Sequence, residues 1–469
     1  MDKSVKILSV KEKIGYGLGD SASSIFYKLF TTFLMFFYTD VFGIPAAAAG
    51  TMILVTRIWD AANDPIMGLI ADRTSTRWGK FRPYLVWVAV PFGIIGILTF
   101  TTPNFGPAGK LAYAYITYTL MMMVYTAINV PYSSLIGVMT SDSIERTSLA
   151  SYRYFFAYAG GILLQATLFK LSELYGKGNN SLGWQLSIAH FALIAIILFI
   201  VTFLWTKERI KPIQNEKPLV KTDLMDLMMN RQWLILLLVV IFAIIFNQLR
   251  EGAAVYYFKY YIMNTSLQVF GKSVHLEYKT LTSILIPVWT ASNMLGVLMA
   301  TWLARTLGKK QAFNLFMIIS VFASLLYYTV TPDCIYYLFI LQIVVGIAAG
   351  LPLPLMLAMF GDIVDYSEWK TGRRATGLIF SSVSMSQKFG SALGIALTGY
   401  ILAAFGYQPE RITAESQTGI KFMMSVIPAL AAGFSVLMLY FYRLNDNYMK
   451  GIEVELSKRR GSIGTHTMR

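Results

Sequence analysis

A short stretch of the sequence, "RIWDAANDPIMG" (residues 57–68), places Arg57, Asp60 and Asp64 in an otherwise apolar segment. Asp60 and Asp64 are one helical turn apart and share a helix face, with Asn63 adjacent to it. Two carboxylates this close repel each other until a proton or a cation lies between them. Asn63 adds a neutral oxygen, which suits a hard cation such as Na⁺. The pattern predicts a coupling site, whereas in the alternative Arg57 neutralises Asp60 and Asp64 pairs with another helix.

The chain around this stretch has the composition of a membrane protein with many spans. Its 469 residues are 56% hydrophobic and 14% charged, and the mean hydropathy is +0.55. A membrane helix needs about 20 consecutive apolar residues. Twelve such runs are predicted, near 14–38, 46–70, 84–102, 111–139, 149–174, 184–205, 233–262, 281–304, 311–331, 334–360, 376–404 and 419–442.

The basic residues indicate how the spans are oriented. Lysines and arginines concentrate in the N-terminal tail, in the loops after spans 2, 6 and 8, and in the C-terminal tail. By the positive-inside rule, both termini are expected in the cytoplasm. The net charge of +15 therefore indicates topology and contact with anionic lipids, and not a nucleic-acid partner. Cys334 is the only cysteine, so the chain forms no intramolecular disulfide.

The longest polar connection divides the chain into two similar halves. It predicts an N-terminal six-helix bundle at 1–206, a cytoplasmic linker at 207–232, a C-terminal six-helix bundle at 233–442 and a cytoplasmic tail at 443–469. A weak internal repeat supports this division, because "GLIADRTSTRWGKFRP" (68–83) is echoed by "GVLMATWLARTLGKKQ" (296–311). The expected fold is all-α, with twelve transmembrane helices in two pseudo-symmetric bundles, which is the major facilitator plan and implies alternating access.

Other charged residues also fall inside predicted spans. An ionised side chain at the bilayer centre costs at least about 2.5–3.5 kcal/mol on insertion scales, so such residues usually pair or face a water-filled cavity. Asp20, Ser24 and Lys28 lie along one face of span 1. Carboxylates suit sugar hydroxyls, whereas Lys and Arg suit hydroxyls or a uronate carboxylate. Lys28, Arg153 and Lys388 thus suggest an acidic sugar, although Lys28 and Lys388 could equally neutralise the span 2 aspartates.

Four motifs together resemble one transporter family. They are "RIWDAANDPIMG", "DRTSTRWGKFRP", "YGLGD" on span 1 and "DIVDYSEWKTGRRATG" (362–377). They are similar to the glycoside-pentoside-hexuronide:cation symporter family, which includes melibiose permease, over nearly the full chain. The resemblance implies cation binding by Asp60, Asn63, Asp64 and Thr126. It implies Na⁺ as the coupling ion bound at Asp60 and Asp64, while H⁺ stays open because the same carboxylates can titrate.

The same resemblance points to a sugar site that departs from melibiose permease. Its two sugar-binding aspartates and its tryptophan correspond to Ser24, Asn129 and Ser133, and only the span 5 arginine is kept, as Arg153. A melibiose-type galactoside is therefore not expected, and Asp20 can take the role of the span 1 acid. The substrate-binding candidates are Asp20, Ser24, Lys28, Asn129, Ser133, Arg153 and Lys388.

Charged loops near the predicted cytoplasmic ends of the spans are candidates for gates. The residues concerned are Asp72, Arg73 and Arg77 after span 2, and Asp362, Asp365 and Arg373 between spans 10 and 11. Topology signals and a solvated loop are the plainer explanations. Arg250 and Glu251 on span 7 are expected to form a structural or gating pair.

These features predict a cation-coupled sugar or glycoside symporter of the plasma membrane, with a bacterial inner membrane expected. Its partners would be the sugar, the coupling cation and membrane lipids, and no cofactor is expected beyond Na⁺ or H⁺. A lysolipid transporter on the same fold is the nearer alternative. An intramembrane aspartyl protease is a distant one, because "GLGD" (17–20) matches one of its motifs but no Tyr in the chain is followed by Asp.

Overall fold

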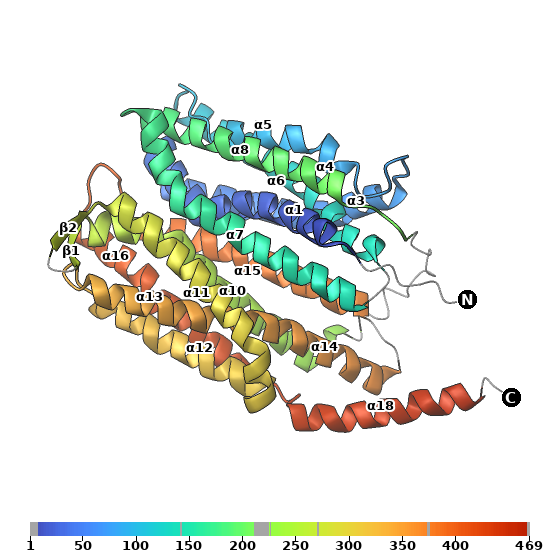
Figure 1. Ribbon diagram of the computed structural model, residues 1–469. Coiled ribbons are helices and arrows are strands. Elements are labelled where there is room, and N and C mark those ends of the chain that lie inside the picture. The colour runs from blue at the N-terminus through green and yellow to red at the C-terminus, as the bar shows by residue number, and fades with distance from the viewer. Residues whose placement is uncertain are drawn as a thin grey trace. The chain divides into compact units, whose positions relative to one another are not determined.

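The computed structural model describes residues 8–140, 143–210, 225, 227–269, 272–372 and 376–466. The first half of the described chain is helical throughout (Figure 1). Span 1 begins as an α-helix and continues through two π-helical segments. The elements are α1 (Val10–Lys28), η1 (Leu29–Phe33), α2 (Leu34–Phe36), η2 (Phe37–Phe42), α3 (Ala46–Arg73), α4 (Tyr84–Trp87), α5 (Ala89–Thr99), α6 (Pro107–Met139), α7 (Ser143–Gly176) and α8 (Asn180–Trp205).

The second half adds one β-hairpin to a further set of helices. In the hairpin β1 (Thr265–Val269) pairs antiparallel with β2 (Lys272–Leu276). The helices are α10 (Arg231–Tyr256), η3 (Tyr257–Ile262, π-helical), α11 (Tyr278–Leu307), α12 (Lys309–Leu326), η4 (Tyr327–Thr329), α13 (Ile335–Gly350), α14 (Pro352–Thr371), α15 (Thr376–Ala404), α16 (Ala414–Met424), α17 (Val426–Tyr440) and α18 (Asp446–His466).

Every predicted span falls on one helix or on consecutive helical segments. Within the described residues, nine stretches are long and apolar enough to cross a membrane. The other three predicted spans coincide with α3, with α4 and α5 together, and with α15. On α3, the charges of Arg57, Asp60 and Asp64 lower the mean hydropathy of an otherwise apolar helix.

The described chain forms two compact units. The first contains Met1–Gln214, Glu251–Thr290 and Ile395–Ile420, and the second contains Asn215–Arg250, Ala291–Gly394 and Lys421–Arg469. The first unit therefore combines the helices of the first chain half with segments of α10, α11, α15 and α16. We call the part of this unit formed by η2, η3, the β-hairpin and the α15–α16 connection the hairpin end.

Within the first unit, span 1 is the central helix. Its most apolar stretch is 78% buried, more than that of any other candidate span in the described chain. Helix α1 packs against α7 and α8, and α3 packs against α6. The packing is close, because a Cβ on Gly160 of α7 would lie 2.6 Å from the backbone oxygen of Ser21 on α1. Polar groups on so buried a helix must find partners inside the protein.

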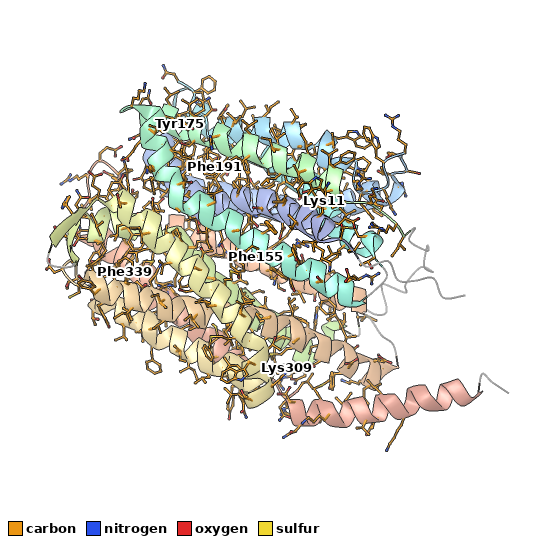
Figure 2. The ribbon with its side chains drawn as sticks, viewed as in Figure 1. Lys11, Phe155, Tyr175, Phe191, Lys309 and Phe339 are labelled. Atoms are coloured by element: carbon orange, nitrogen blue, oxygen red, sulfur yellow. The ribbon has the colours of Figure 1, made fainter. Side chains whose placement is uncertain are left out.

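Apolar side chains also cover the outer surface of the helices. Phe155, labelled in Figure 2, is 55% exposed on α7, whereas Phe191 on α8 is 1% exposed. Exposed aromatic and aliphatic residues recur along most of the helices. A surface of this kind is typical of helices that face lipid.

In the second unit, α12 packs against α13, α14 and α17, and α18 packs against α14. Helix α18, red in Figure 1, begins beside the junction of α11 and α12. There the backbone N–H of Lys309 donates to Oδ2 of Asp446 across 2.9 Å. Gly308 has φ of +86° and approaches Asp446 so closely that a Cβ would lie 2.4 Å from its carboxylate. A glycine is required there for both reasons.

Candidate functional site

The two span 2 carboxylates meet a hydroxyl from α6. Oγ1 of Thr126 lies 2.7 Å from Oδ1 of Asp60 and 3.1 Å from Oδ1 of Asp64. Asp60 and Thr126 are each 2% exposed, and Asp64 is half-buried. The α-helical spacing on α3 directs both carboxylates to one face, and the packing of α3 on α6 brings Thr126 between them. Two carboxylates and a hydroxyl make an all-oxygen donor set, which fits a hard monovalent cation.

Two further residues of α3 flank this cluster. Asn63 is half-buried and shares the helix with both aspartates. Arg57 is 7% exposed, one turn before Asp60. Among the described residues, Nε and Nη2 of Arg57 have no hydrogen-bond partner. A charge can be balanced without a hydrogen bond from these two atoms, so the alternative in which Arg57 neutralises Asp60 stays a prediction.

The predicted span 1 acid and span 5 arginine form an ion pair. Nε of Arg153 on α7 donates to Oδ2 of Asp20 on α1 across 3.1 Å. The guanidinium lies over the ring of Tyr132, 5.3 Å from its centroid. Tyr132 in turn stacks on Tyr16 with 4.9 Å between ring centroids, and its hydroxyl donates to the backbone oxygen of Tyr16 across 2.6 Å. Tyr16 and Tyr132 are each 0% exposed, so this buried aromatic stack holds the guanidinium beside Asp20.

The sequence did not single out Tyr16 and Tyr132, and a sequence signal was available only for the first. Tyr16 lies one turn before Asp20 in "GYGLGD", and Tyr132 directly precedes Ser133 in "NVPYSSL". A tyrosine one helical turn from a predicted sugar-binding carboxylate is the signal that could have identified the first. The second is recognisable only once α6 and α7 are brought together.

The other substrate-binding candidates differ in their surroundings. Ser24 on α1 and Asn129 on α6 are half-buried, and Ser133 on α6 is exposed. Nδ2 of Asn129 donates to the backbone oxygen of Tyr125 in its own helix across 3.0 Å. Lys388 is half-buried on α15 and belongs to the second unit, whereas Asp20 and Arg153 belong to the first.

Lys28 pairs with a carboxylate of α10. Its Nζ lies 2.9 Å from Oε1 and 3.1 Å from Oε2 of Glu251. Thr31 and Thr32 also donate to Oε1 of Glu251, across 3.0 and 2.6 Å. The Glu251 side chain is 4% exposed and that of Lys28 is 19% exposed. Lys28 thus pairs with Glu251, and not with a span 2 aspartate as the alternative had it.

The expected pair between Arg250 and Glu251 is wrong. Nη1 of Arg250 donates to the backbone oxygen of Met424 across 2.6 Å, and the guanidinium lies 4.3 Å from the ring centroid of Tyr327. Adjacent residues of a helix do not face each other, so the two side chains point to different neighbours. Helix geometry alone argues against a pair of consecutive residues.

The buried carboxylate of Asp40 lies at the hairpin end. Oδ1 of Asp40 accepts from Nζ of Lys259 across 2.7 Å and also from the hydroxyl of Tyr260. Oδ2 accepts from Tyr407 across 2.8 Å. The Asp40 side chain is 1% exposed. Asp40 comes from the first chain half, whereas Lys259, Tyr260 and Tyr407 come from the second, so the two halves are joined there.

The predicted gate residues are only partly described. Arg373 lies outside the described residues, and so does the side chain of Asp72. Arg73 and Arg77 are exposed, and Asp365 is half-buried. Asp362 is 7% exposed, and its Oδ1 accepts from Nζ of Lys309 across 2.6 Å within the second unit.

A carboxylate that was not predicted shapes the loop after span 2. Glu208 accepts hydrogen bonds from the backbone N–H groups of Lys80, Phe81 and Arg82, each across 2.8 Å. Burial lowers the pKa of the Arg82 guanidinium, and the nearby Glu208 carboxylate opposes that shift. Arginine stays charged at neutral pH even so. The loop is therefore held by side-chain to backbone bonds, which spacing along the sequence does not predict.

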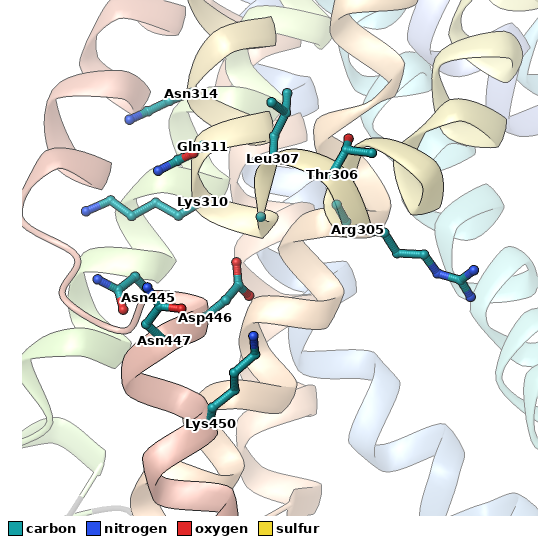
Figure 3. Close-up of a pocket in the computed structure, with 12 residues that line it drawn as sticks. Arg305, Thr306, Leu307, Lys310, Gln311, Asn314, Asn445, Asp446, Asn447 and Lys450 are labelled. Carbon is teal, nitrogen blue, oxygen red and sulfur yellow. The ribbon is translucent and has the colours of Figure 1, made fainter.

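A cavity of about 640 Å³ lies in the second unit, at the junction of α11 and α12 and the start of α18 (Figure 3). Lys310, Asn445 and Lys450 are among its lining residues. The side chain of Arg305 points away from that of Lys310 in the close-up. Within the described residues, this cavity contains none of the residues predicted for the cation or the sugar.

Known proteins resemble the chain along nearly its whole length. The family of MFS/sugar transport proteins matches residues 15–446. The putative glycoside/cation symporter YagG of Escherichia coli is 36% identical over 459 residues, which is 97% of this chain and 97% of that protein. The isoprimeverose transporter of Lactiplantibacillus pentosus is 34% identical over 439 residues, covering 92% of this chain and 88% of that protein.

Solved structures share the fold. A bacterial homologue of the human peptide transporters PepT1 and PepT2 matches with a TM-score of 0.68 over 95% of this chain and 100% of that chain, at 11% identity. The predicted major facilitator fold is thus confirmed. The protein is a multi-pass membrane transporter, and its family and relatives support sugar symport. The alternative of an intramembrane aspartyl protease is wrong. The chain belongs to the glycoside-pentoside-hexuronide:cation symporter family of the major facilitator superfamily.

Proposed function

We propose that this protein is a Na⁺-coupled symporter of a neutral glycoside that works by alternating access. The contact of one hydroxyl, that of Thr126, with both Asp60 and Asp64 carries the proposal. A hydroxyl has one proton, so at any moment it can donate to only one of the two carboxylates. A cation between the carboxylates would relieve their repulsion and take the Thr126 oxygen as a further ligand.

The choice of Na⁺ rests on the donor set. Four oxygen-bearing side chains are available on two adjacent helices: Asp60, Asn63 and Asp64 on α3 and Thr126 on α6. A proton would need only one carboxylate, whereas an ion that sheds its water needs several oxygens. The amide oxygen of Asn63 and the hydroxyl of Thr126 can each coordinate Na⁺, whereas neither is needed to bind a proton.

The neutral glycoside is favoured by charge balance. Lys28, Arg153 and Lys388 were the basis for expecting an acidic sugar, and the first two belong to the first unit. Lys28 is paired with Glu251, and Arg153 is paired with Asp20. A uronate would have to compete with a buried carboxylate for either cation, whereas a neutral sugar can accept from Arg153 and donate to Asp20 with the pair intact.

Coupling follows from linkage between the two sites. If a bound cation tightens sugar binding by some factor, the sugar must tighten cation binding by the same factor. Helix α6 carries Thr126 of the cation site and Tyr132, which lies under Arg153 of the sugar site. A shift of this helix on cation binding would therefore reach the sugar site directly.

Uptake into proteoliposomes tests the proposal. The panel contains neutral glycosides, uronides and a lysolipid, each under an imposed Na⁺ or H⁺ gradient. A neutral glycoside is expected to accumulate only with Na⁺, and Asp64→Asn is expected to abolish accumulation. The matched control is Glu173→Gln, because the Glu173 side chain is 48% exposed and pairs with Lys279 outside both sites.

Other results would replace parts of the proposal. Accumulation driven by H⁺ alone would assign the carboxylates to proton transfer. A uronide that outcompetes every neutral glycoside would overturn the charge-balance argument. Transport of the lysolipid with no sugar moving under either gradient would exclude sugar symport by this protein.

A further inference from the structure

A buried polar network joins span 1 to α10, apart from the cation site and from the Asp20–Arg153 pair. Its centre is the Glu251 carboxylate, which accepts from Lys28, Thr31 and Thr32. Nε2 of Gln165 on α7 lies 3.4 Å from Oε1 of Glu251. Oε1 of Gln165 accepts from Thr290 on α11 across 2.7 Å. Span 1, α7, α10 and α11 thus meet in this network.

The backbone of span 1 is adapted to this network. Lys28 is the last residue of α1, and Thr31 and Thr32 lie in the π-helical segment η1. Both threonine hydroxyls reach the same oxygen of Glu251 although the residues are consecutive. π-Helical turns are rare and occur frequently at functional sites. On α7, Gly161 leaves room for Lys28, because a Cβ there would lie 2.9 Å from Cγ of the lysine.

The network connects the two halves of the chain. Within the described residues, the side chains that donate to Glu251 all belong to the first half of the chain. Glu251 itself belongs to the second half. Alternating access requires the halves to separate on each side of the membrane in turn. When they separate near the hairpin end, Glu251 must part from Lys28 and from the hydroxyls of Thr31 and Thr32.

We propose that Lys28 and Glu251 are positioning residues for transport, and that their buried pair keeps the hairpin end closed until the two halves separate. The inference rests on the proposed alternating access. It assigns to Lys28 a role in closure in place of sugar binding. A buried ion pair that loses its partner is left with an uncompensated charge, so the pair resists partial opening.

Cysteine accessibility tests the proposal without any sugar. In a Cys334→Ser background, Thr39→Cys places a thiol at the hairpin end, where Thr39 is 4% exposed and contacts Tyr256 of the second half. Thr99→Cys places a second reporter inside the first half, where Thr99 is 0% exposed and contacts the backbone of α6. Opening of the hairpin end exposes the first thiol, and unfolding exposes both.

The double variant Lys28→Met with Glu251→Gln removes the pair without leaving one charge unmatched. Labelling of Thr39→Cys by a membrane-impermeant maleimide is expected to become about tenfold faster, with Thr99→Cys still protected. Glu173→Gln breaks the exposed pair with Lys279 and is the matched control, with a labelling rate expected within about twofold of the parent. An unchanged rate at Thr39→Cys in the double variant would overturn the proposal.

The double variant could unfold, in which case the cysteines at positions 39 and 99 would both be labelled. A milder variant then tests the closure proposal. Thr32→Val removes the 2.6 Å bond to Glu251 while keeping the shape of the side chain and both charges. It is expected to speed labelling of Thr39→Cys about threefold, and no increase would overturn the proposal. Failure of sugar uptake leaves this readout unaffected, so the transport proposal and the closure proposal can fail separately.

Discussion

Oγ1 of Thr126 lies 2.7 Å from Oδ1 of Asp60, and this contact joins α6 to α3 inside the first unit. Asp64 is 3.1 Å from the same hydroxyl. The α-helix alone brings the two carboxylates together, but it supplies no group to separate them. The third oxygen comes from a helix that begins more than thirty residues after α3 ends. The candidate cation site is thus a product of helix packing as well as of local sequence.

Thr126→Val is expected to weaken Na⁺ binding, because valine keeps the shape of threonine and removes its oxygen. The loss should be about tenfold, which corresponds to about 1.4 kcal/mol. Thr126→Ser keeps the oxygen and should bind within about threefold of the wild type. Titration calorimetry of Na⁺ into purified protein measures both. Equal Na⁺ affinity for the valine variant and the wild type would remove Thr126 from the site.

Arg153→Lys is expected to weaken sugar binding about tenfold with little effect on stability. Lysine keeps the charge, but it cannot reproduce the Nε bond to Asp20 together with the flat contact on Tyr132. Arg146→Lys on the same helix is the control, since Arg146 is exposed and bonds only to the backbone of residues 137 and 140 among its recorded contacts. Binding of the glycoside identified by uptake gives the affinity, and thermal unfolding gives the stability. A similar loss in both variants would argue against a specific role for Arg153.

Gly160→Ala is expected to destabilise the protein by about 1–3 kcal/mol, because the new Cβ would meet the backbone of α1. It would lie 2.6 Å from the oxygen of Ser21, which a helix shift alone can relieve. Gly137→Ala on α6 is the control, since nothing lies within 4 Å of its Cβ position. That variant should gain about 0.5–1 kcal/mol from the helix preference of alanine. Thermal unfolding in detergent distinguishes them, and equal melting temperatures would contradict the close packing of α1 on α7.

Glu208→Ala is expected to release the loop after span 2. The three backbone N–H groups of residues 80–82 would lose their acceptor, and each unmet bond costs about 1–3 kcal/mol when the group stays buried. Hydrogen exchange at these three amides should become about tenfold faster or more, with the amides of α5 unchanged. Glu173→Ala on α7 serves as the control for loss of an exposed carboxylate. Unchanged exchange at residues 80–82 would mean that other contacts hold the loop.

Much of this protein is determined by sequence alone, because the relevant information is local. The apolar runs fix where helices cross the membrane, since the backbone must satisfy its own hydrogen bonds in lipid. The spacing of Asp60 and Asp64 fixes that they share a helix face, since the α-helix has a constant period. For the same reason Asp20 and Lys28 could be placed on one face of span 1. A charged residue within an apolar span also predicts a buried partner, as Lys28 and Arg153 show.

The partners themselves were decided only by tertiary structure. The sequence left Lys28 with two roles, and the structure pairs it with Glu251, which is 223 residues away. It also separates Arg250 from Glu251, because consecutive helical side chains diverge and each follows the neighbour that its own face meets. Asp40 and Glu208 gave no signal at all, since one acts through three residues of the second half and the other through backbone groups of a distant loop. Helix periodicity specifies which residues face inward, but the choice of partner depends on which helices pack together, and that depends on the whole chain.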